Sequence, residues 1–174
     1  RLIPAQGARS TLVASFAEVA GAADAVVAVG RTLRPSMLEL MDQASINAVE
    51  DHQPMGLDRT VGALLIAQSD APGAARAEEI AVIEAACRAT GASDVFLTDD
   101  ADEGEMFVEA RRAAFPAIEA RGALLLEDVG VPVPVLPALL AAVAAIADRL
   151  QVEIPVVAHA GDGNTHPITV YDAA

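Results

Sequence analysis

Two short apolar segments near the end of the chain limit its fold most strongly. They read IPVVAHA (154–160) and HPITVYD (166–172), and a short loop rich in Gly and Asp separates them. Such a loop can join antiparallel strands but cannot contain the crossover that parallel strands need. The two segments therefore predict a β-hairpin, which argues against the alternative of a doubly wound parallel sheet.

Upstream of this hairpin, short apolar segments alternate with longer Ala-rich segments. Strands are expected at residues 10–16, 37–42, 61–70, 93–100 and 123–132, and helices at about 17–33, 43–51, 71–92, 101–122 and 135–150. Asp42 is placed to cap the second helix, and Pro116 is expected to kink or interrupt the fourth. The order predicts one α+β domain over residues 1–174, a ferredoxin-like plait with a mostly antiparallel sheet and helices packed on one face.

The charge and the cysteine content exclude several classes of function. The net charge is −14, which disfavours binding to nucleic acid or to an acidic membrane surface. The single cysteine, Cys87, cannot form an internal disulfide, which favours a reducing, cytoplasmic location. Residues 129–147 carry no charge, but three prolines crowd their first half, so we expect no membrane span.

The loop of the expected hairpin is the first candidate site. His159 and His166 flank it, and the hairpin should gather their imidazoles at its mouth. Two such rings can share a divalent metal such as Zn or Mn, or one can act as a base. Gly161, Asp162 and Gly163 permit a tight turn, and Asn164 and exposed loop amides could contact a ligand. The alternative is that Asp-Gly is only turn chemistry and that the histidines are incidental.

The segment EARRAAFPAI supplies the second candidate. Arg111 and Arg112 lie about 100° apart on a helix, so only one should face a site, where it could clamp a substrate carboxylate. A surface pair with Glu105 or Glu109 is the simpler alternative. Two other acidic groups, Glu127 with Asp128 and the run 99–105, and also His52, are more typical of solvated positions, although one of the first two carboxylates could lie inside.

Four segments in this order resemble one known family. HAGDGNTHP resembles the GHAGDGNLHP signature of the C-terminal domain of FAD-linked oxidases, and LELMDQASINAVE, EARRAAFPAI and LLLEDVGVP resemble three further segments of that domain. The family contains the glycolate oxidase large subunit, bacterial D-lactate dehydrogenases and D-2-hydroxyglutarate dehydrogenase. The resemblance spans residue 36 to the end and is closest to the glycolate oxidase branch.

The resemblance implies an activity. In this family the C-terminal domain covers the flavin of a separate FAD-binding domain of the same polypeptide, and the enzyme oxidises a D-2-hydroxy acid to the 2-oxo acid. By resemblance, His159 and His166 would be catalytic residues or metal ligands, and Arg111 would bind the substrate carboxylate. Asn164 would line the substrate pocket, and the loop 161–163 would contact the cofactor. Other oxidase subunits or a second copy of the chain are further expected partners.

The chain also departs from the family pattern. Val108 stands where the family usually has Trp, and a downstream acidic-His motif that supplies a third metal ligand is missing. The opening RLIPAQ resembles the end of an FAD domain, so the chain is expected to be an excised cap that is inactive alone. The alternative is a free-standing ferredoxin-like module that binds a small ligand or a metal without catalysis, or that serves subunit association.

Overall fold

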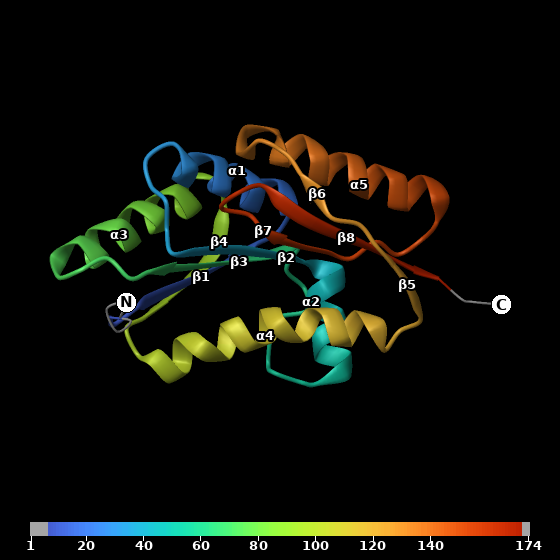
Figure 1. Cartoon of the computed structure of the whole chain (residues 1–174), viewed down its shortest axis with the longest axis horizontal. Helices are drawn as coiled ribbons and strands as arrows, with labels where there is room; N and C mark the ends of the chain where they lie inside the picture. The colour runs from blue at the N-terminus through green and yellow to red at the C-terminus, as the bar shows by residue number, and fades with distance from the viewer. Residues whose placement is uncertain (1–6, 172–174) are drawn as a thin grey trace, which may run out of the picture.

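The computed structural model describes residues 7–171. The expectation based on RLIPAQ falls on residues 1–6 and lies outside the described part of the chain. Within that part, the predicted alternation of strands and helices is confirmed, and the chain is an α+β protein built on an antiparallel sheet (Figure 1).

The sheet has the order β4-β1-β3-β2-β7-β8-β5, and β6 pairs with β8. Every pair of neighbouring strands among the described residues is antiparallel. The strands are β1 (Ser10–Phe16), β2 (Met37–Asp42), β3 (Ala63–Ser69), β4 (Ala92–Thr98), β5 (Ala123–Leu126), β6 (Val129–Gly130), β7 (Val156–His159) and β8 (Asn164–Tyr171). The predicted hairpin is β7–β8, and it extends the sheet on the side of β2.

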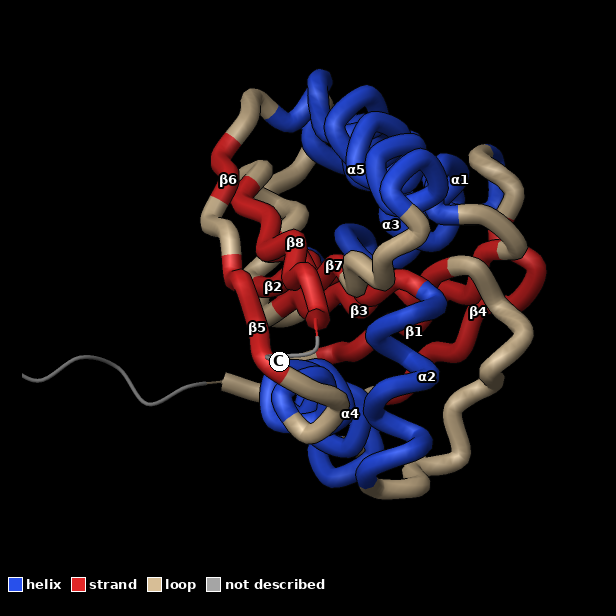
Figure 2. Tube along the Cα trace, turned by 90° about the vertical axis from the view of Figure 1, so that its right-hand side faces the viewer, coloured by secondary structure: helices blue, strands red, loops and turns tan. Residues whose placement is uncertain are grey.

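The helices cover both faces of the sheet, so the expectation of helices on one face is wrong. They are α1 (Val19–Gly30), α2 (Gln43–His52), α3 (Ala74–Ala89), α4 (Ala101–Glu119), the 3-10 turn η1 (Val133–Val135) and α5 (Leu136–Leu150). In Figure 2 the sheet is the middle layer, with α1, α3 and α5 on one side and α2 and α4 on the other.

Alternate residues of the same strands explain the two layers. Leu12, Ala14 and Phe16 of β1 belong to the core under α1, α3 and α5, whereas Val13 belongs to the core under α2 and α4. Successive side chains of a strand point to opposite faces, so a strand that is apolar at every position must be covered twice. All seven residues of β3 are buried, in agreement with this rule.

Two local predictions are corrected by the structure. Residues 123–132 do not form one strand, because Glu127 and Asp128 separate β5 from β6 and both are exposed. Pro116 does not interrupt α4, which runs unbroken from Ala101 to Glu119. Proline in a helix removes one backbone donor and crowds the preceding turn, but Pro116 lies in the last turn, where the packing of Ala117 and Ile118 in the core favours the helix.

Helix α5 is buried only near its start. Leu136 and Leu140 are in the core, whereas Ile146 and Leu150 are exposed. By length and composition alone, residues 133–150 are the one stretch of the described chain that could cross a membrane. Because one side of this stretch packs on α1, the feature is weak evidence for a span.

Cys87 faces the core of the α3 layer. It is fully buried, and among the described residues it is the free cysteine. Burial raises the pKa of its thiol to about 12, so the side chain stays uncharged at neutral pH. Its position fits a small core residue.

Asp42 links three elements that lead to the hairpin. As predicted, its carboxylate caps α2, accepting a hydrogen bond from the backbone N of Ser45 at 2.8 Å. Its other oxygen accepts from the backbone N of Val156 at 2.9 Å, where β7 begins. Burial raises the pKa of Asp42 to about 6, although the hydrogen bonds from Ser45 and Val156 oppose the rise.

We therefore expect Asp42 to make stability depend on pH between about 4 and 6. Its folded pKa lies above its ordinary value of 3.8, so its contribution is full below that value and is lost as the pH rises through about 6. The difference between a pKa of 3.8 and one of about 6 corresponds to about 3 kcal/mol of free energy of unfolding. Urea unfolding at a series of pH values should show this slope for the native chain and a flatter profile for Asp42→Asn.

Asp58→Asn is the matched control for this measurement. Asp58 is exposed, and its hydrogen bonds with Thr60 lower the pKa of its carboxyl. Any effect of Asp58 on the pH dependence of stability is therefore expected below about pH 4, outside the range in which Asp42 acts. The control should keep the slope between pH 4.5 and 6. An identical slope in Asp42→Asn and the native chain would contradict the assignment.

Candidate functional site

The strand register places three polar side chains in one row across the sheet. Glu39 of β2 lies opposite His159 of β7, and His159 lies opposite Asn164 of β8. Directly opposed residues of antiparallel strands have side chains on the same face. Met41 and Val157, two residues along the same strands, belong to the core under α2 and α4, so the row lies on the face that α4 covers.

His166 lies in the next row on that face, opposite Val157. The His159 and His166 ring centroids are 5.4 Å apart and the ring planes are at 89°. The side chain of His159 is 52% exposed and that of His166 is 21% exposed. The hairpin thus gathers the two imidazoles, as the sequence predicts. Nδ1 of His166 is 3.7 Å from Oδ1 of the exposed Asp128.

Helix α4 brings Arg111 to the same place. Val108, Ala114 and Ile118 form the buried side of α4, and Arg111 occupies the same side. Its side chain is 13% exposed and its Nε lies 3.0 Å from Oε2 of Glu39. The expectation that only one of the two arginines faces inward is confirmed.

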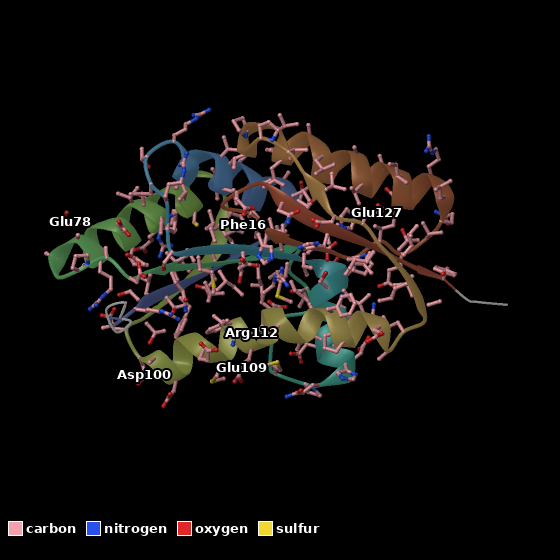
Figure 3. The ribbon with its side chains drawn as sticks, viewed as in Figure 1. Phe16, Glu78, Asp100, Glu109, Arg112 and Glu127 are labelled. Carbon is pink, nitrogen blue, oxygen red and sulfur yellow. The ribbon has the colours of Figure 1, made fainter. Side chains whose placement is uncertain are left out.

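Arg112 forms the surface ion pair that was the simpler alternative for this segment. It forms an ion pair with Glu105 on the same helix, and both side chains are exposed. Figure 3 shows Arg112, Glu109 and Asp100 distributed along α4. Asp100 caps this helix by accepting hydrogen bonds from the backbone N atoms of Asp102 and Glu103.

Glu39 is the residue of this group that the sequence interpretation did not select. Its Oε1 lies 2.7 Å from Nδ1 of His159, and its Oε2 forms the ion pair with Arg111. Burial lowers the pKa of Arg111, and the carboxylate of Glu39 opposes that effect. The signal in the sequence was a single acidic residue inside the apolar segment MLELM, because a carboxylate that turns toward a helix-covered face needs a partner.

Two buried polar atoms at this site have no hydrogen bond. Among the described residues, Nε of Arg111 and Oδ1 of Asn164 are the buried side-chain polar atoms without a hydrogen-bond partner. Nε of Arg111 nevertheless lies 3.0 Å from Oε2 of Glu39, so the ion pair engages it, and Oδ1 of Asn164 is the atom of the two that has no partner in the described part of the chain. Buried polar groups are almost always satisfied, so an unpaired acceptor at the same site as a buried arginine indicates a place prepared for a ligand.

The loop between the histidines is held by its own chain. The backbone N of Gly161 donates to the carbonyl of Leu38, that of Asp162 to His159, and that of Gly163 to Ala160. These amides are therefore not free to bind a ligand, contrary to the expectation of exposed loop amides. Contact between the loop 161–163 and a cofactor stays a prediction, and side chains or close packing would have to provide it.

A cavity of about 300 Å³ lies beside the row. Its lining includes Glu39, His159, Gly161 and Asp162, together with residues 34–38, whereas Arg111, Asn164 and His166 are not part of that lining. The volume is at the lower end of the range for ligand sites and suits a small molecule. A second cavity of the same volume lies between α3 and strands β1 and β4 and contains no histidine.

The residues present do not form a metal centre by themselves. No group of three or more His, Cys, Asp or Glu side chains that could hold a metal occurs in residues 7–171. A catalytic zinc takes three protein ligands, and the hairpin supplies two imidazoles. His159 and His166 would need a further ligand from elsewhere, so no chemical step is assigned to a metal here.

Of the remaining candidate residues, Asp128 reaches the site only through His166, and Glu127 and His52 have no recorded contact with it in the described part of the chain. Glu127 and Asp128 are both exposed, so neither is the inward carboxylate that the sequence allowed. His52 is exposed at the end of α2, as expected.

Comparison with known proteins agrees with the sequence signature. Residues 5–174 match the profile of the family described as FAD linked oxidases, C-terminal domain. The chain is 30% identical over 174 residues to the glycolate oxidase subunit GlcD of Bacillus subtilis (strain 168), covering 99% of this chain and 37% of that protein. It is 31% identical over 175 residues to GlcD of Escherichia coli (strain K12), covering 99% and 35%.

The fold is also found in a solved structure. The alkyldihydroxyacetonephosphate synthase, in its P1 crystal form, aligns with a TM-score of 0.63 and 12% identity, covering 92% of this chain and 35% of that one. At this identity the likeness concerns the fold alone. The chain spans little more than a third of the length of its curated relatives. On the family profile and these identities, the chain belongs to the C-terminal domain family of FAD-linked oxidases.

Proposed function

We propose that this chain is the substrate-binding part of an FAD-linked oxidoreductase that converts a D-2-hydroxy acid, of the glycolate or lactate type, to the 2-oxo acid. The relatives named as glycolate oxidase subunits support this proposal. The observation that carries it is the buried guanidinium of Arg111 at the same site as Oδ1 of Asn164, a buried acceptor without a hydrogen-bond partner among the described residues. A hydroxy acid offers a carboxylate to the first residue and a hydroxyl donor to the second.

The chain's own residues would perform two tasks in this reaction. Arg111 would hold the substrate carboxylate and so fix the distance between C2 and the neighbouring groups. Oxidation then removes a proton from the hydroxyl and a hydride from C2, and a carbonyl forms. His159 would take the proton, because its Nδ1 is occupied by Glu39 and its Nε2 is left to act as the base. FAD, when bound, supplies the acceptor for the hydride.

The described residues do not hold FAD by themselves. The amides of the loop 161–163 are occupied and residues 7–171 offer no Gly-rich phosphate cradle, so FAD would be bound mainly by a separate domain of a longer polypeptide. We expect the 174-residue chain alone to be colourless and inactive. A divalent metal at His159 and His166 is the alternative to the base role, because Nε2 of His159 can serve only one of the two. Association with other oxidase subunits and a cytoplasmic location are further parts of the proposal.

The finer fold assignment is a proposal as well. The strand order β4-β1-β3-β2, with α1 and α3 on one face, supports a ferredoxin-like plait within residues 10–98. Helix α2 would then be an insertion that covers the other face, and the β7–β8 hairpin an addition at the β2 edge.

The test is turnover by the full-length protein that contains this chain. Purified protein should show a flavin absorbance spectrum and should reduce an artificial electron acceptor in the presence of glycolate or D-lactate, and L-lactate should be a poor substrate. A flavin spectrum without oxidation of any short 2-hydroxy acid would reject the substrate class. A yellow and active 174-residue chain would reject the division of labour between the domains.

A further inference from the structure

We propose that Glu39 is the positioning residue of this site: its carboxylate holds His159 and Arg111 at the same time and fixes which atoms of each remain for a ligand. The inference deepens the proposed function and rests on it for its kinetic test. It is independent of any metal.

The contact with His159 selects one tautomer of the imidazole. Oε1 of Glu39 is 2.7 Å from Nδ1 of His159. An ionised carboxylate only accepts hydrogen bonds, so Nδ1 must carry the proton and Nε2 must carry the lone pair. Glu39 therefore decides which nitrogen of His159 is available to serve as the base.

The contact with Arg111 leaves the other edge of the guanidinium available. Glu39 is the partner of Arg111 in the described part of the chain, and it lies beside Nε. The Nη atoms of a guanidinium can form two parallel hydrogen bonds with a second carboxylate. Both side chains are 13% exposed, so the carboxylate of Glu39 also offsets the cost of burying this cation before a substrate arrives.

Two neighbouring strands and the packing of the adjacent residues fix the backbone at Glu39. It is the third residue of the six-residue strand β2, which pairs with β3 on one side and β7 on the other. Leu38 and Leu40, its neighbours in the strand, are buried in the opposite core. A group held in this way keeps the geometry of the residues that it contacts, which is the requirement for a site built to a tolerance of about 0.5 Å.

Glu39→Gln in the full-length protein tests the proposal. The Gln amide presents one acceptor and one donor, so it can match only one of the two donors that Glu39 now holds. We expect kcat to fall by up to about 100-fold, the effect of a small misplacement of groups that must be aligned with the substrate. In a His159→Ala background, the same change should lower kcat by a smaller factor, because one of the two groups through which Glu39 acts is already gone and only the contact with Arg111 remains.

Glu50→Gln is the matched control. Glu50 is also buried, but it accepts hydrogen bonds from the backbone N atoms of Met55 and Leu57, away from the site. Its replacement should lower the melting temperature and leave kcat unchanged. Fully multiplicative effects of Glu39→Gln and His159→Ala would show that Glu39 does not act through His159 and would overturn the proposal that it positions both residues.

Nuclear magnetic resonance separates this proposal from the proposed function. In protein labelled with ¹⁵N at histidine, the shifts of His159 should report protonated Nδ1, and Glu39→Gln should change the ratio of the tautomers. This result needs no turnover, so it stands even if no hydroxy acid is oxidised. An unchanged tautomer ratio in Glu39→Gln would contradict the positioning role while leaving the proposed function intact.

Discussion

Replacing His159 by Ala in the full-length protein is expected to lower kcat by about 10²- to 10⁴-fold, the range for the loss of a general base. The melting temperature should change little, because the side chain is 52% exposed and belongs to neither core. His166→Ala should also lower kcat, since its ring lies 5.4 Å from that of His159. Steady-state kinetics and thermal unfolding of the same preparations check both expectations.

His52→Ala provides the control for these variants. His52 is exposed at the end of α2, outside the row of site residues. Its replacement should alter neither kcat nor the melting temperature. If His159→Ala instead lost stability in proportion to its activity, the histidine would be a structural residue and the site assignment would be wrong.

Gly163→Ala is expected to destabilise the chain by about 3 kcal/mol. Gly163 has φ +82°, and a Cβ at this position would lie 2.0 Å from the carbonyl oxygen of Val131. The left-handed conformation alone costs a non-Gly residue about 1–2 kcal/mol, and overlap inside a packed structure adds about 1–3 kcal/mol. The contact cannot relax cheaply, because the backbone N of Val131 donates to the carbonyl of Gly163 at 3.0 Å.

Gly130→Ala is the matched control for this change. Gly130 lies on β6 opposite Asn164, and nothing lies within 4 Å of a Cβ built there. Urea unfolding should give a free energy close to that of the native chain for Gly130→Ala and a much lower one for Gly163→Ala. Equal free energies of unfolding for the two variants would show that the loop can shift to accept a Cβ at position 163. The contact with Val131 would then not be the reason for a glycine there.

The packing around Gly161 and Gly163 also gives a structural reason for the glycines of the hairpin loop. In the sequence, Gly161 and Gly163 permit a tight turn, and the family resemblance implies that their loop contacts the cofactor. In the structure, Gly163 is required by the carbonyl of Val131, and Gly161 lies against Leu38, with a Cβ 3.3 Å from that side chain. The glycines of the motif are therefore explained by the chain's own packing, whereas the histidines are not.

Most of the elements were predictable because they depend on local patterns. Asp42 before an Ala-rich segment predicted a cap, and the adjacent Arg111 and Arg112 predicted one inward and one outward guanidinium; both are confirmed. The second helical layer was missed, although the uninterrupted apolar segment ALLIA of β3 contained the signal. A strand with no polar face has no side to leave in water, so helices had to cover both faces.

The sequence by itself determined the antiparallel hairpin, the two histidines beside its loop and the family to which the chain belongs. It could not determine that Glu39 lies between His159 and Arg111, residues that are 120 and 72 positions away from it in the chain. Only the pairing of β2 with β7 and the packing of α4 across them decided this arrangement. The physical reason is that strand register and helix docking depend on the burial of two whole cores, a long-range balance that no local pattern contains.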